Sequence, residues 1–435
     1  MRRTPMFRAV ALATLLAVTS SCVSTQLPPV SASGGGFEPL PDEAELWDQA
    51  RDEEEQLLEK VTLYDDPLLE SYLEEVVVRL NPPGMAANPA IRYRVRVIED
   101  PTLNAFAYPH GALYVHTGIL ARMENEDQLA TVLAHEMTHV ENRHMLRYQR
   151  SARNKQVGLM VAAVAASVIA ADAEWDALSD GDWAKAATID VVSDLIIGLG
   201  LQLAFLASIK GYGRGLEWEA DEGGFAKMGD AGYDLTEAPK VYQALLDDRG
   251  EPKRAAAFFF GSHPRLSERV ANTKQYLAEH PVDPVQASSE EATRPDTFER
   301  RIMPVVRDNA RLNIERGRFQ LAESELERAS EWMPEDPETR FLMGRLRLAE
   351  ADVEKDPENQ RRLRLDAADA FREAIRMDAD RPAPHRELGL LLYDQEAYRE
   401  ACTELGYYVE LAPDADDADR VQDYVLELRE DGHCR

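Results

Sequence analysis

Small residues recur at a fixed spacing of 34 in the last third of this 435-residue chain. Ala310 is followed by Gly344 at that spacing, and Ala367 is followed by Ala401. Gly344 and Gly389 are 45 apart, which is 34 plus 11, so we infer an insert of 11 residues inside the second unit. A fixed period predicts stacked helical units, because each unit buries its apolar face only against its neighbours.

The period is that of the tetratricopeptide repeat, in which two helices cross closely where small residues lie. The polar run 352–362 is the candidate insert. Two stretches carry the repeat pattern: Gly317, Phe319, Ala322, Leu326, Ala329 and Pro334 in the first unit, and Tyr398, Ala401, Leu405 and Pro413 in the third. We therefore predict an all-α solenoid over residues 301–435, with three repeats and a terminal helix. The alternative is an ordinary helical bundle.

The charge balance excludes one class of partner. The chain has 49 lysines and arginines against 79 aspartates and glutamates, a formal net charge of −30. Such an excess of acid repels phosphate backbones, so we expect no nucleic-acid partner. The three cysteines are too few for a disulfide scaffold or a four-thiolate metal site. Cys402 and Cys434 lie where antiparallel helices would bring their ends together, so they are candidates for a disulfide, with free thiols as the alternative.

The N-terminal residues have the pattern of a secretory signal peptide. A basic start and a short apolar run, 9–18, precede Thr19, Ser20, Ser21 and Cys22. The end of this segment resembles a bacterial lipobox, so we predict a signal peptide over 1–21 and a lipid on Cys22, with secretion without lipid as the alternative. Residues 22–37 are rich in Pro, Ser and Gly, which predicts a flexible tether.

A metal-binding motif lies on a predicted helix. Asn125 is the expected N-cap, with Gln128 closing a capping box. His135, Glu136 and His139 then form H-E-x-x-H, whose i, i+4 spacing puts both imidazoles on one face, where their nitrogens can converge on one ion. Glu136 is placed to accept a proton from water activated there. This chemistry is that of a zinc hydrolase.

A third ligand is needed, because a catalytic zinc has three protein ligands. Glu217 and Asp221 are four residues apart and therefore share a helix face, whereas Glu219 points elsewhere. One of the two acids could bind the metal while the other holds a ligand histidine. The spacing leaves open which acid does which.

The residues between the tether and the repeats have a mixed α and β pattern. Residues 91–98 and 112–116 have the pattern of strands, and the apolar runs 156–171 and 195–209 are too short to span a bilayer. These runs are buried core helices or, as the alternative, a hairpin at a membrane face. We predict an α+β, mainly α, peptidase domain over 38–280 with a small antiparallel sheet. A linker over 281–300 follows.

Four segments resemble the HtpX and CAAX-prenyl-protease family of zinc metallopeptidases, and within it the periplasmic BepA-type subgroup with C-terminal tetratricopeptide repeats. They are Asn104-Ala-Phe-Ala-Tyr-Pro109 with Gly111, the zinc motif with His144, Arg214-Gly-Leu-Glu-Trp-Glu-Ala-Asp221 with Gly224, and Ser262-His-Pro264 with Arg269. The sequence departs from the family pattern at Gly213, where Ser is usual, and at His110, which could alter the rim of the cleft.

The resemblance implies a zincin-type fold and one zinc ion per chain. It implies that His135, His139 and Glu217 bind the zinc and that Asp221 supports a ligand. It also implies that His263 is a fourth ligand that keeps the enzyme latent, with Arg269 pinning its loop. We expect His144 to be structural, held by packing beneath the helix.

Two functions follow from these observations. The first is a zinc-dependent endopeptidase, anchored to the outer membrane from the periplasm through Cys22, that degrades misfolded or misassembled envelope proteins. We expect its substrate to add as a strand along residues 112–115. The second is a repeat-domain adaptor or chaperone of outer-membrane protein assembly whose peptidase site is silent. The resemblance implies the barrel-assembly machinery as a partner.

Overall fold

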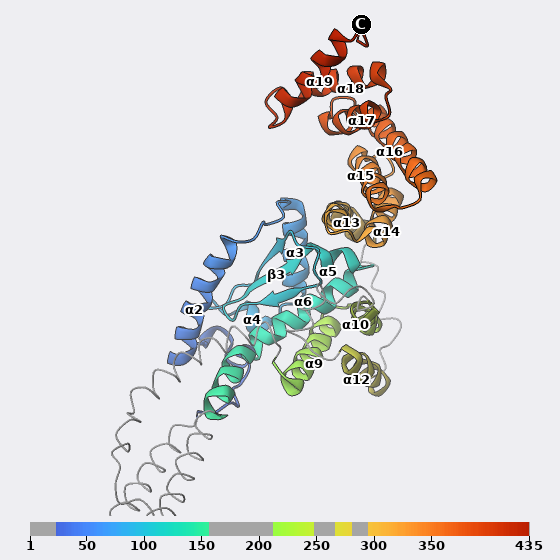
Figure 1. Ribbon diagram of the computed structural model, residues 1–435. Helices are drawn as coiled ribbons and strands as arrows, with labels where there is room; N and C mark the ends of the chain where they lie inside the picture. Colours follow the sequence, from blue (N-terminus) through green and yellow to red (C-terminus); the bar gives the residue numbers. More distant parts are fainter. Residues whose placement is uncertain (1–22, 156–211, 248–265, 281–294, 435) are drawn as a thin grey trace, which may run out of the picture. The chain divides into compact units, whose positions relative to one another are not determined.

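The computed structural model describes residues 23–155, 212–247, 266–280 and 295–434 (Figure 1). Several predicted features lie outside these ranges: the signal peptide, Cys22, the apolar runs 156–171 and 195–209, and His263. The described residues form two compact units. The first contains residues 23–98, 102–115, 123–155, 212–247 and 266–280, and the second contains 99–101, 116–122 and 295–434.

The first unit is mainly helical and contains one small sheet. In chain order its elements are η1 (Val30–Gly36), α2 (Pro41–Leu58), α3 (Pro67–Leu80), α4 (Pro83–Ala86), β1 (Arg94–Ile98), β2 (Ala105–Ala107), β3 (Ala112–His116, whose last residue belongs to the second unit), α6 (Glu126–Glu141), α9 (Arg214–Asp230), η2 (Leu235–Glu237), α10 (Ala238–Asp247) and α12 (Leu266–Glu279). Residues 144–155 are also helical. This composition agrees with the predicted α+β, mainly α, class.

The sheet is mixed, so the predicted antiparallel sheet is wrong in one pairing. The strand order is β1-β3-β2, and β2 is antiparallel to β3, with Phe106 opposite Tyr114. The amide of Arg94, at the start of β1, donates to the carbonyl of Gly111, just before β3. The two strands therefore begin side by side and run in the same direction. β3 is the central strand, so residues 112–115 are not the edge that we expected a substrate to join.

The helix that carries the metal motif is a core helix. Asn125 caps α6 as predicted, because its Oδ1 accepts from the amide of Gln128 at 2.9 Å. The Gln128 side chain accepts from the amide of Glu124 at 3.0 Å rather than from Asn125, so the expected capping box is displaced by one residue. Every residue from Gln128 to Glu141 is buried. α6 contacts β2 on one side and α9 on the other, and lies between the sheet and α9 (Figure 1).

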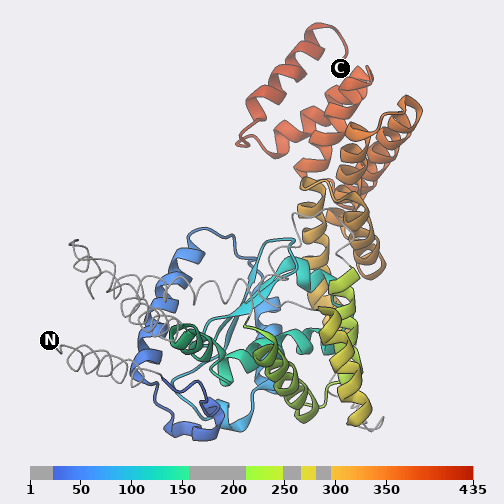
Figure 2. The same cartoon turned by 60° about the horizontal axis from the view of Figure 1, so that its bottom comes forward.

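The second unit is a row of helices. Its elements are α5 (Thr117–Arg122), α13 (Pro295–Glu315), α14 (Phe319–Trp332), α15 (Pro337–Val353), α16 (Pro357–Met377), α17 (Pro382–Asp394), α18 (Tyr398–Leu411) and α19 (Ala418–Glu430). Contacts are densest within the pairs α13/α14, α15/α16 and α17/α18, and each helix from α13 onward also packs on the next (Figure 2). That these pairs are tetratricopeptide repeats stays a prediction.

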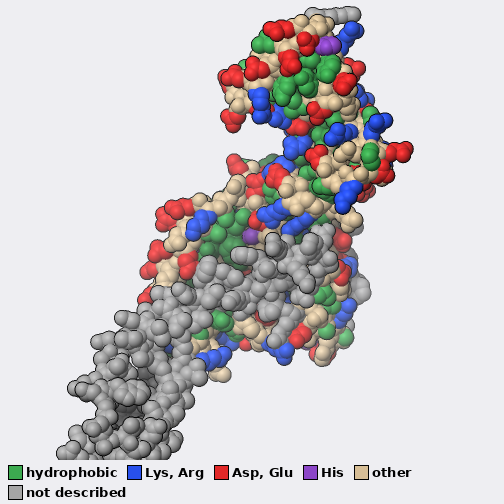
Figure 3. All heavy atoms as spheres, in the orientation of Figure 1, with side chains coloured by type: hydrophobic (Ala, Val, Ile, Leu, Met, Phe, Trp, Pro, Cys, Tyr) green, Lys and Arg blue, Asp and Glu red, His purple; other side chains and the backbone are tan. Residues whose placement is uncertain are grey.

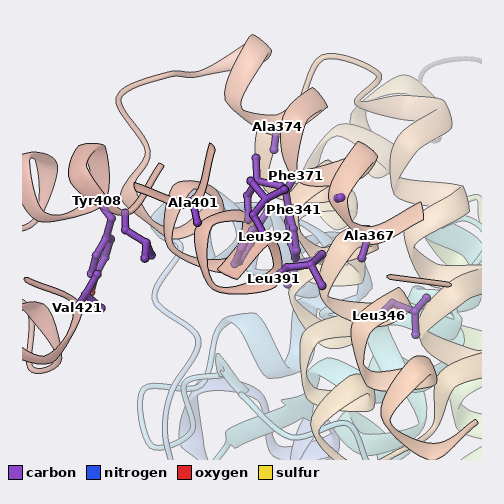
Figure 4. Close-up of a cluster of buried hydrophobic side chains, with 14 of the residues drawn as sticks. Phe341, Leu346, Ala367, Phe371, Ala374, Leu391, Leu392, Ala401, Tyr408 and Val421 are labelled. Atoms are coloured by element: carbon purple, nitrogen blue, oxygen red, sulfur yellow. The ribbon is translucent and has the colours of Figure 1, made fainter. Parts of the chain in front are cut away.

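The repeated glycines allow the close helix crossings that their spacing suggested. A Cβ at Gly344 in α15 would overlap the ring of Phe371 in α16, and a Cβ at Gly389 in α17 would lie 2.6 Å from Leu405 Cδ2 in α18. Phe371 and Leu405 are themselves 34 residues apart. Both belong to one buried apolar cluster, in which the rings of Phe341 and Phe371 have centroids 5.8 Å apart (Figure 4).

The polar run 352–362, our candidate insert, lies where α15 ends and α16 begins. α15 has 17 residues against 13 in α17, and α16 has 21 against 14 in both α14 and α18. The additional residues therefore lengthen two packed helices instead of forming a long loop.

The second unit includes residues that the predicted boundaries gave to the peptidase domain. α5 packs on α13, and the buried Thr117 hydroxyl lies 2.9 Å from Asn309 Oδ1. Residues 99–101 also belong to this unit. Of the predicted linker 281–300, residues 281–294 lie outside the described residues and 295–300 form the start of α13. Composition does not reveal such contacts between distant segments.

At the other end of the unit, Cys402 in α18 and Cys434 after α19 form a disulfide, with Cα atoms 5.8 Å apart. Within the described ranges, no helix combines the length and the apolar character that crossing a membrane requires.

Candidate active site

Two histidines converge on the buried face of α6. His135 and His139 are one helical turn apart, and their Nε2 atoms lie 3.0 Å from each other. Their ring planes cross at 81° with centroids 4.6 Å apart. Both side chains are almost fully buried. The i, i+4 spacing thus directs both Nε2 atoms to a single point, as predicted.

α9 brings a carboxylate to the same point. Glu217 Oε2 lies 3.6 Å from His135 Nε2, and Glu217 Oε1 lies 3.9 Å from His139 Nε2. Two glycines of α9 allow this approach: a Cβ at Gly223 would lie 2.5 Å from Thr138 Cγ2, and a Cβ at Gly224 would lie 3.3 Å from the backbone nitrogen of His135. The sequence spacing left open whether Glu217 or Asp221 would bind the metal, and Glu217 is the one that faces both Nε2 atoms.

The donor set fits a zinc ion. Ligand atoms of His135, His139 and Glu217 all lie within 4.8 Å of one another, and in the described part of the chain this is the one such group of three. Two imidazoles and one carboxylate are among the donor sets of catalytic zinc sites, where they leave a fourth position open. The residues present therefore match the implied metal in number and kind.

Behind His135 lies a buried carboxylate. Asp221 Oδ1 is 2.9 Å from His135 Nδ1, and it accepts a hydrogen bond from the Tyr242 hydroxyl at 2.8 Å. Arg269 from α12 binds the same carboxylate, and its Nη2 also lies 3.0 Å from His135 Nδ1. Burial by itself would raise the pKa of Asp221, but the charges of Arg269 and His135 and their hydrogen bonds hold this pKa below its ordinary value. Asp221 thus contacts the ring nitrogen of His135 that points away from Glu217, and its role in supporting a metal ligand stays a prediction.

Arg269 was expected to pin the loop of His263, which lies outside the described residues. The structure shows that its guanidinium binds Asp221 and lies 4.0 Å from the centroid of the Tyr242 ring. Sequence reasoning missed Tyr242 because no motif marks it, and only the packing of α10 brings it to the site.

Tyr212 is a second residue that the sequence did not single out. Its ring stacks on His139 with centroids 4.4 Å apart, and its backbone amide lies 3.4 Å from Glu217 Oε1. Burial, together with the charges of Glu136 and Glu217, raises the pKa of Tyr212. A neutral phenol is thus fixed beside the predicted ligands. Its position just before the Arg214 segment was the one available signal.

Glu136 directly follows His135 in α6, and His144 lies beside the ring of His139. Glu136 is buried in the turn that carries the two histidines. His144 is fully buried, with its Nδ1 2.8 Å from His139 Nδ1. Burial and the nearby charge of Arg147 lower the pKa of His144 to about 4, so its ring is neutral near pH 7.

His110 is buried against α2, and its predicted effect on the rim of the cleft stays a prediction. The ring is buried, and Nε2 lies 2.8 Å from Glu54 Oε2 in α2. The Tyr114 hydroxyl donates to the other oxygen of Glu54 at 2.7 Å. His110 therefore ties the sheet to α2.

Comparison with known proteins gives a consistent result. Residues 67–277 match the model of Peptidase family M48. The chain is 28% identical over 223 residues to the beta-barrel assembly-enhancing protease of Escherichia coli (strain K12), which covers 50% of this chain and 41% of that protein. It is 28% identical over 230 residues to the mitochondrial metalloendopeptidase OMA1 of Schizosaccharomyces pombe, which covers 52% of this chain and 59% of that protein. The chain thus spans about half the length of these curated relatives.

Proposed function

This chain belongs to peptidase family M48 through residues 67–277, and from that membership we propose that it is a zinc-dependent endopeptidase of the cell envelope. The observation that carries the proposal is the convergence of His135, His139 and Glu217 in the buried centre of the family-matched region. In the proposal these three residues hold the zinc. When bound, zinc would act as a Lewis acid that polarises a peptide carbonyl and lowers the pKa of water, so that water can lose a proton and attack the carbonyl near neutral pH.

The chain's own residues supply the remaining steps of the proposed reaction. Glu136 accepts the proton of the attacking water and later gives it to the amine that leaves. Asp221 and Arg269 fix the orientation of His135, with Nδ1 turned toward the carboxylate. The Tyr212 ring covers His139 and excludes water from that side.

We place the substrate on β2 instead of β3. β2 is an outer strand of the sheet, and it contacts α6, which carries the zinc motif. A substrate strand added at Ala105–Ala107 would pair through backbone hydrogen bonds, which accept many sequences and favour unfolded chains. Selection of misfolded or misassembled envelope proteins follows from this mode of binding. The Escherichia coli relative is named for enhancing beta-barrel assembly, and this name supports substrates that are assembling β-barrel proteins.

Two further features of the proposal rest on the sequence. The leader pattern of residues 1–22 supports a periplasmic protein anchored to the outer membrane by a lipid on Cys22. His263, in a Ser-His-Pro segment, is proposed to occupy the fourth zinc position and to keep the enzyme latent. A signal that moves His263 would then release activity.

The second candidate function is an adaptor or chaperone of outer-membrane assembly, with the barrel-assembly machinery as partner. A cavity of about 680 Å³ between α14, α15 and α16 favours it, lined in part by Phe319, Arg347, Val353 and Leu363. Acidic and basic side chains are mixed on the face of the second unit seen in Figure 3. The proposed solenoid would use such a surface to hold a peptide or helix.

One experiment separates the two functions. Degradation of an unfolded protein is followed with the zinc-loaded wild type, Glu136→Gln and His263→Ala, and Glu222→Gln serves as control because this exposed residue of α9 loses the same charge. We expect Glu136→Gln to be inert, His263→Ala to be faster than the wild type, and the control to match the wild type. Inactivity of all four with zinc bound would favour the adaptor. A His263→Ala variant no faster than the wild type would refute the latency alone.

A further inference from the structure

α9 supplies three carboxylates to the site, and only two of them have a role so far. Glu217 faces the Nε2 atoms of both histidines, and Asp221 lies behind His135. Glu219 lies on the other side of α9 and forms an ion pair with Arg147, whose Nη2 donates to Oε1 at 3.0 Å. The other oxygen, Oε2, lies 3.4 Å from His144 Nε2.

His144 connects this carboxylate to His139. The Nδ1 atoms of His144 and His139 are 2.8 Å apart, which is a hydrogen-bond distance between two ring nitrogens. Two ring nitrogens can share one hydrogen bond only if one of them carries the proton and the other accepts it. At this distance, one of the two Nδ1 atoms must therefore carry a proton and the other must lack one.

The metal ligand decides which ring donates. An Nε2 atom that binds a metal has no proton, so the proton of a neutral His139 is on Nδ1. His139 Nδ1 then donates to His144 Nδ1, and the proton of His144 lies on Nε2, which faces Glu219. Glu219 Oε2, held in place by Arg147, lies 3.4 Å from this nitrogen and favours a proton there through its charge rather than through a hydrogen bond.

We propose that His144, oriented by Glu219 and Arg147, is a positioning residue that fixes the proton of His139 on Nδ1 and leaves Nε2 free to bind the metal. The inference rests on the proposed role of His139 as a ligand. It replaces the expectation that His144 is held only by packing. The two proposed ligand histidines are then held differently. The carboxylate of Asp221 contacts His135 directly, whereas His139 contacts the neutral ring of His144, and Glu219 lies on the far side of that ring.

The test measures zinc affinity of the full chain by competition with a chromophoric chelator. His144→Leu removes the acceptor, whereas His144→Asn keeps an amide oxygen about where Nδ1 lies. We expect His144→Leu to weaken zinc binding by about 10–100-fold, the usual effect of losing such a support, and His144→Asn to recover most of this loss. Glu219→Gln should fall between the wild type and His144→Leu, and the exposed Glu222→Gln should match the wild type.

Two comparisons make the result decisive. If His144→Leu binds zinc like the wild type, or if a folded His144→Asn binds as weakly as His144→Leu, the positioning role is refuted. A loss of packing alone would lower the melting temperature of the metal-free protein without rescue by Asn.

His139→Ala is measured in parallel: if it keeps the wild-type zinc affinity, the proposed metal site itself is wrong, which is a separate failure. The absorption bands of the cobalt-substituted protein give a second readout, since they shift when His139 turns.

Discussion

Arg269 and Asp221 form a buried ion pair with two contacts, in which Nη2 lies 2.6 Å from Oδ1 and Nε lies 3.0 Å from Oδ2. Both side chains are at most 5% exposed. The pair joins α12 to α9 at the back of His135. Removing one member of such a pair leaves the other charge buried without compensation.

Arg269→Met should therefore destabilise the metal-free protein strongly, by about 3–5 kcal/mol in urea unfolding. Arg214→Met is the matched control, because Arg214 also pairs with a carboxylate, Glu268 at 3.2 Å, but is 68% exposed. Exposed pairs contribute about 0–1 kcal/mol. Equal losses in the two variants would contradict the importance of the buried pair.

Acid should destabilise the first unit through Glu54. Burial by itself would raise the pKa of Glu54, but hydrogen bonds from His110 and Tyr114 outweigh it and lower the pKa from 4.5 to about 2. The folded state therefore binds this proton more weakly than the unfolded state. The resulting stability is complete above pH 4.5 and is lost as the pH falls from 4.5 toward 2.

The matching variant is Glu54→Gln. The shift corresponds to about 3 kcal/mol of unfolding free energy. Near pH 6 the unfolding free energy of the wild type should therefore exceed that of the variant by this amount. The difference should shrink toward pH 2. Glu55→Gln, at an exposed position of the same helix, should show no such trend. A difference between the wild type and Glu54→Gln that stays constant with pH would argue against the assignment.

A buried acid in α14 should control the order of α5. Glu325 accepts hydrogen bonds from Asn309 at 3.0 Å and Asn313 at 2.9 Å, and Asn309 in turn contacts Thr117 of α5. Glu325→Ala leaves both amides without this acceptor, at a cost of about 1–3 kcal/mol for each. We expect faster hydrogen exchange in α5 as well as lower stability.

The control for this change is Glu327→Ala, which removes an exposed acid from the same helix. It should leave the exchange of α5 unchanged. If Glu325→Ala also leaves α5 protected, the network does not tie this helix to α13 and α14.

Two glycine replacements should have opposite effects in the second unit. A Cβ at Gly344 would overlap the ring of Phe371, whereas a Cβ at Gly406 in α18 would meet no atom within 4 Å. Gly344→Ala should destabilise by about 1–3 kcal/mol, since the core must move to admit the methyl group. Gly406→Ala should stabilise by up to about 1 kcal/mol, because alanine is the better helix former. Thermal unfolding measures both, and a stabilising Gly344→Ala would refute the close crossing.

Local sequence signals predicted most of the helices and the ligand face. The i, i+4 spacing of His135 and His139 fixes their common direction once the segment is helical, and Asn125 sets where that helix begins. The 34-residue period similarly placed Gly344 and Gly389 at helix crossings. These are properties of one element or of a repeated element, so short-range geometry is enough to obtain them.

Other features depended on which segments meet in space. The sequence pattern recognised the strand at residues 112–116 but not its central position, because strand order is set by pairing partners distant in the chain. Nothing local indicated that Glu219 would meet His144, that Arg269 would bind Asp221, or that α5 would pack with α13. The sequence alone determined the elements and the donor types of the site. Only the tertiary structure decided which buried polar groups satisfy one another, because that pairing depends on how helices that are distant in the chain pack together.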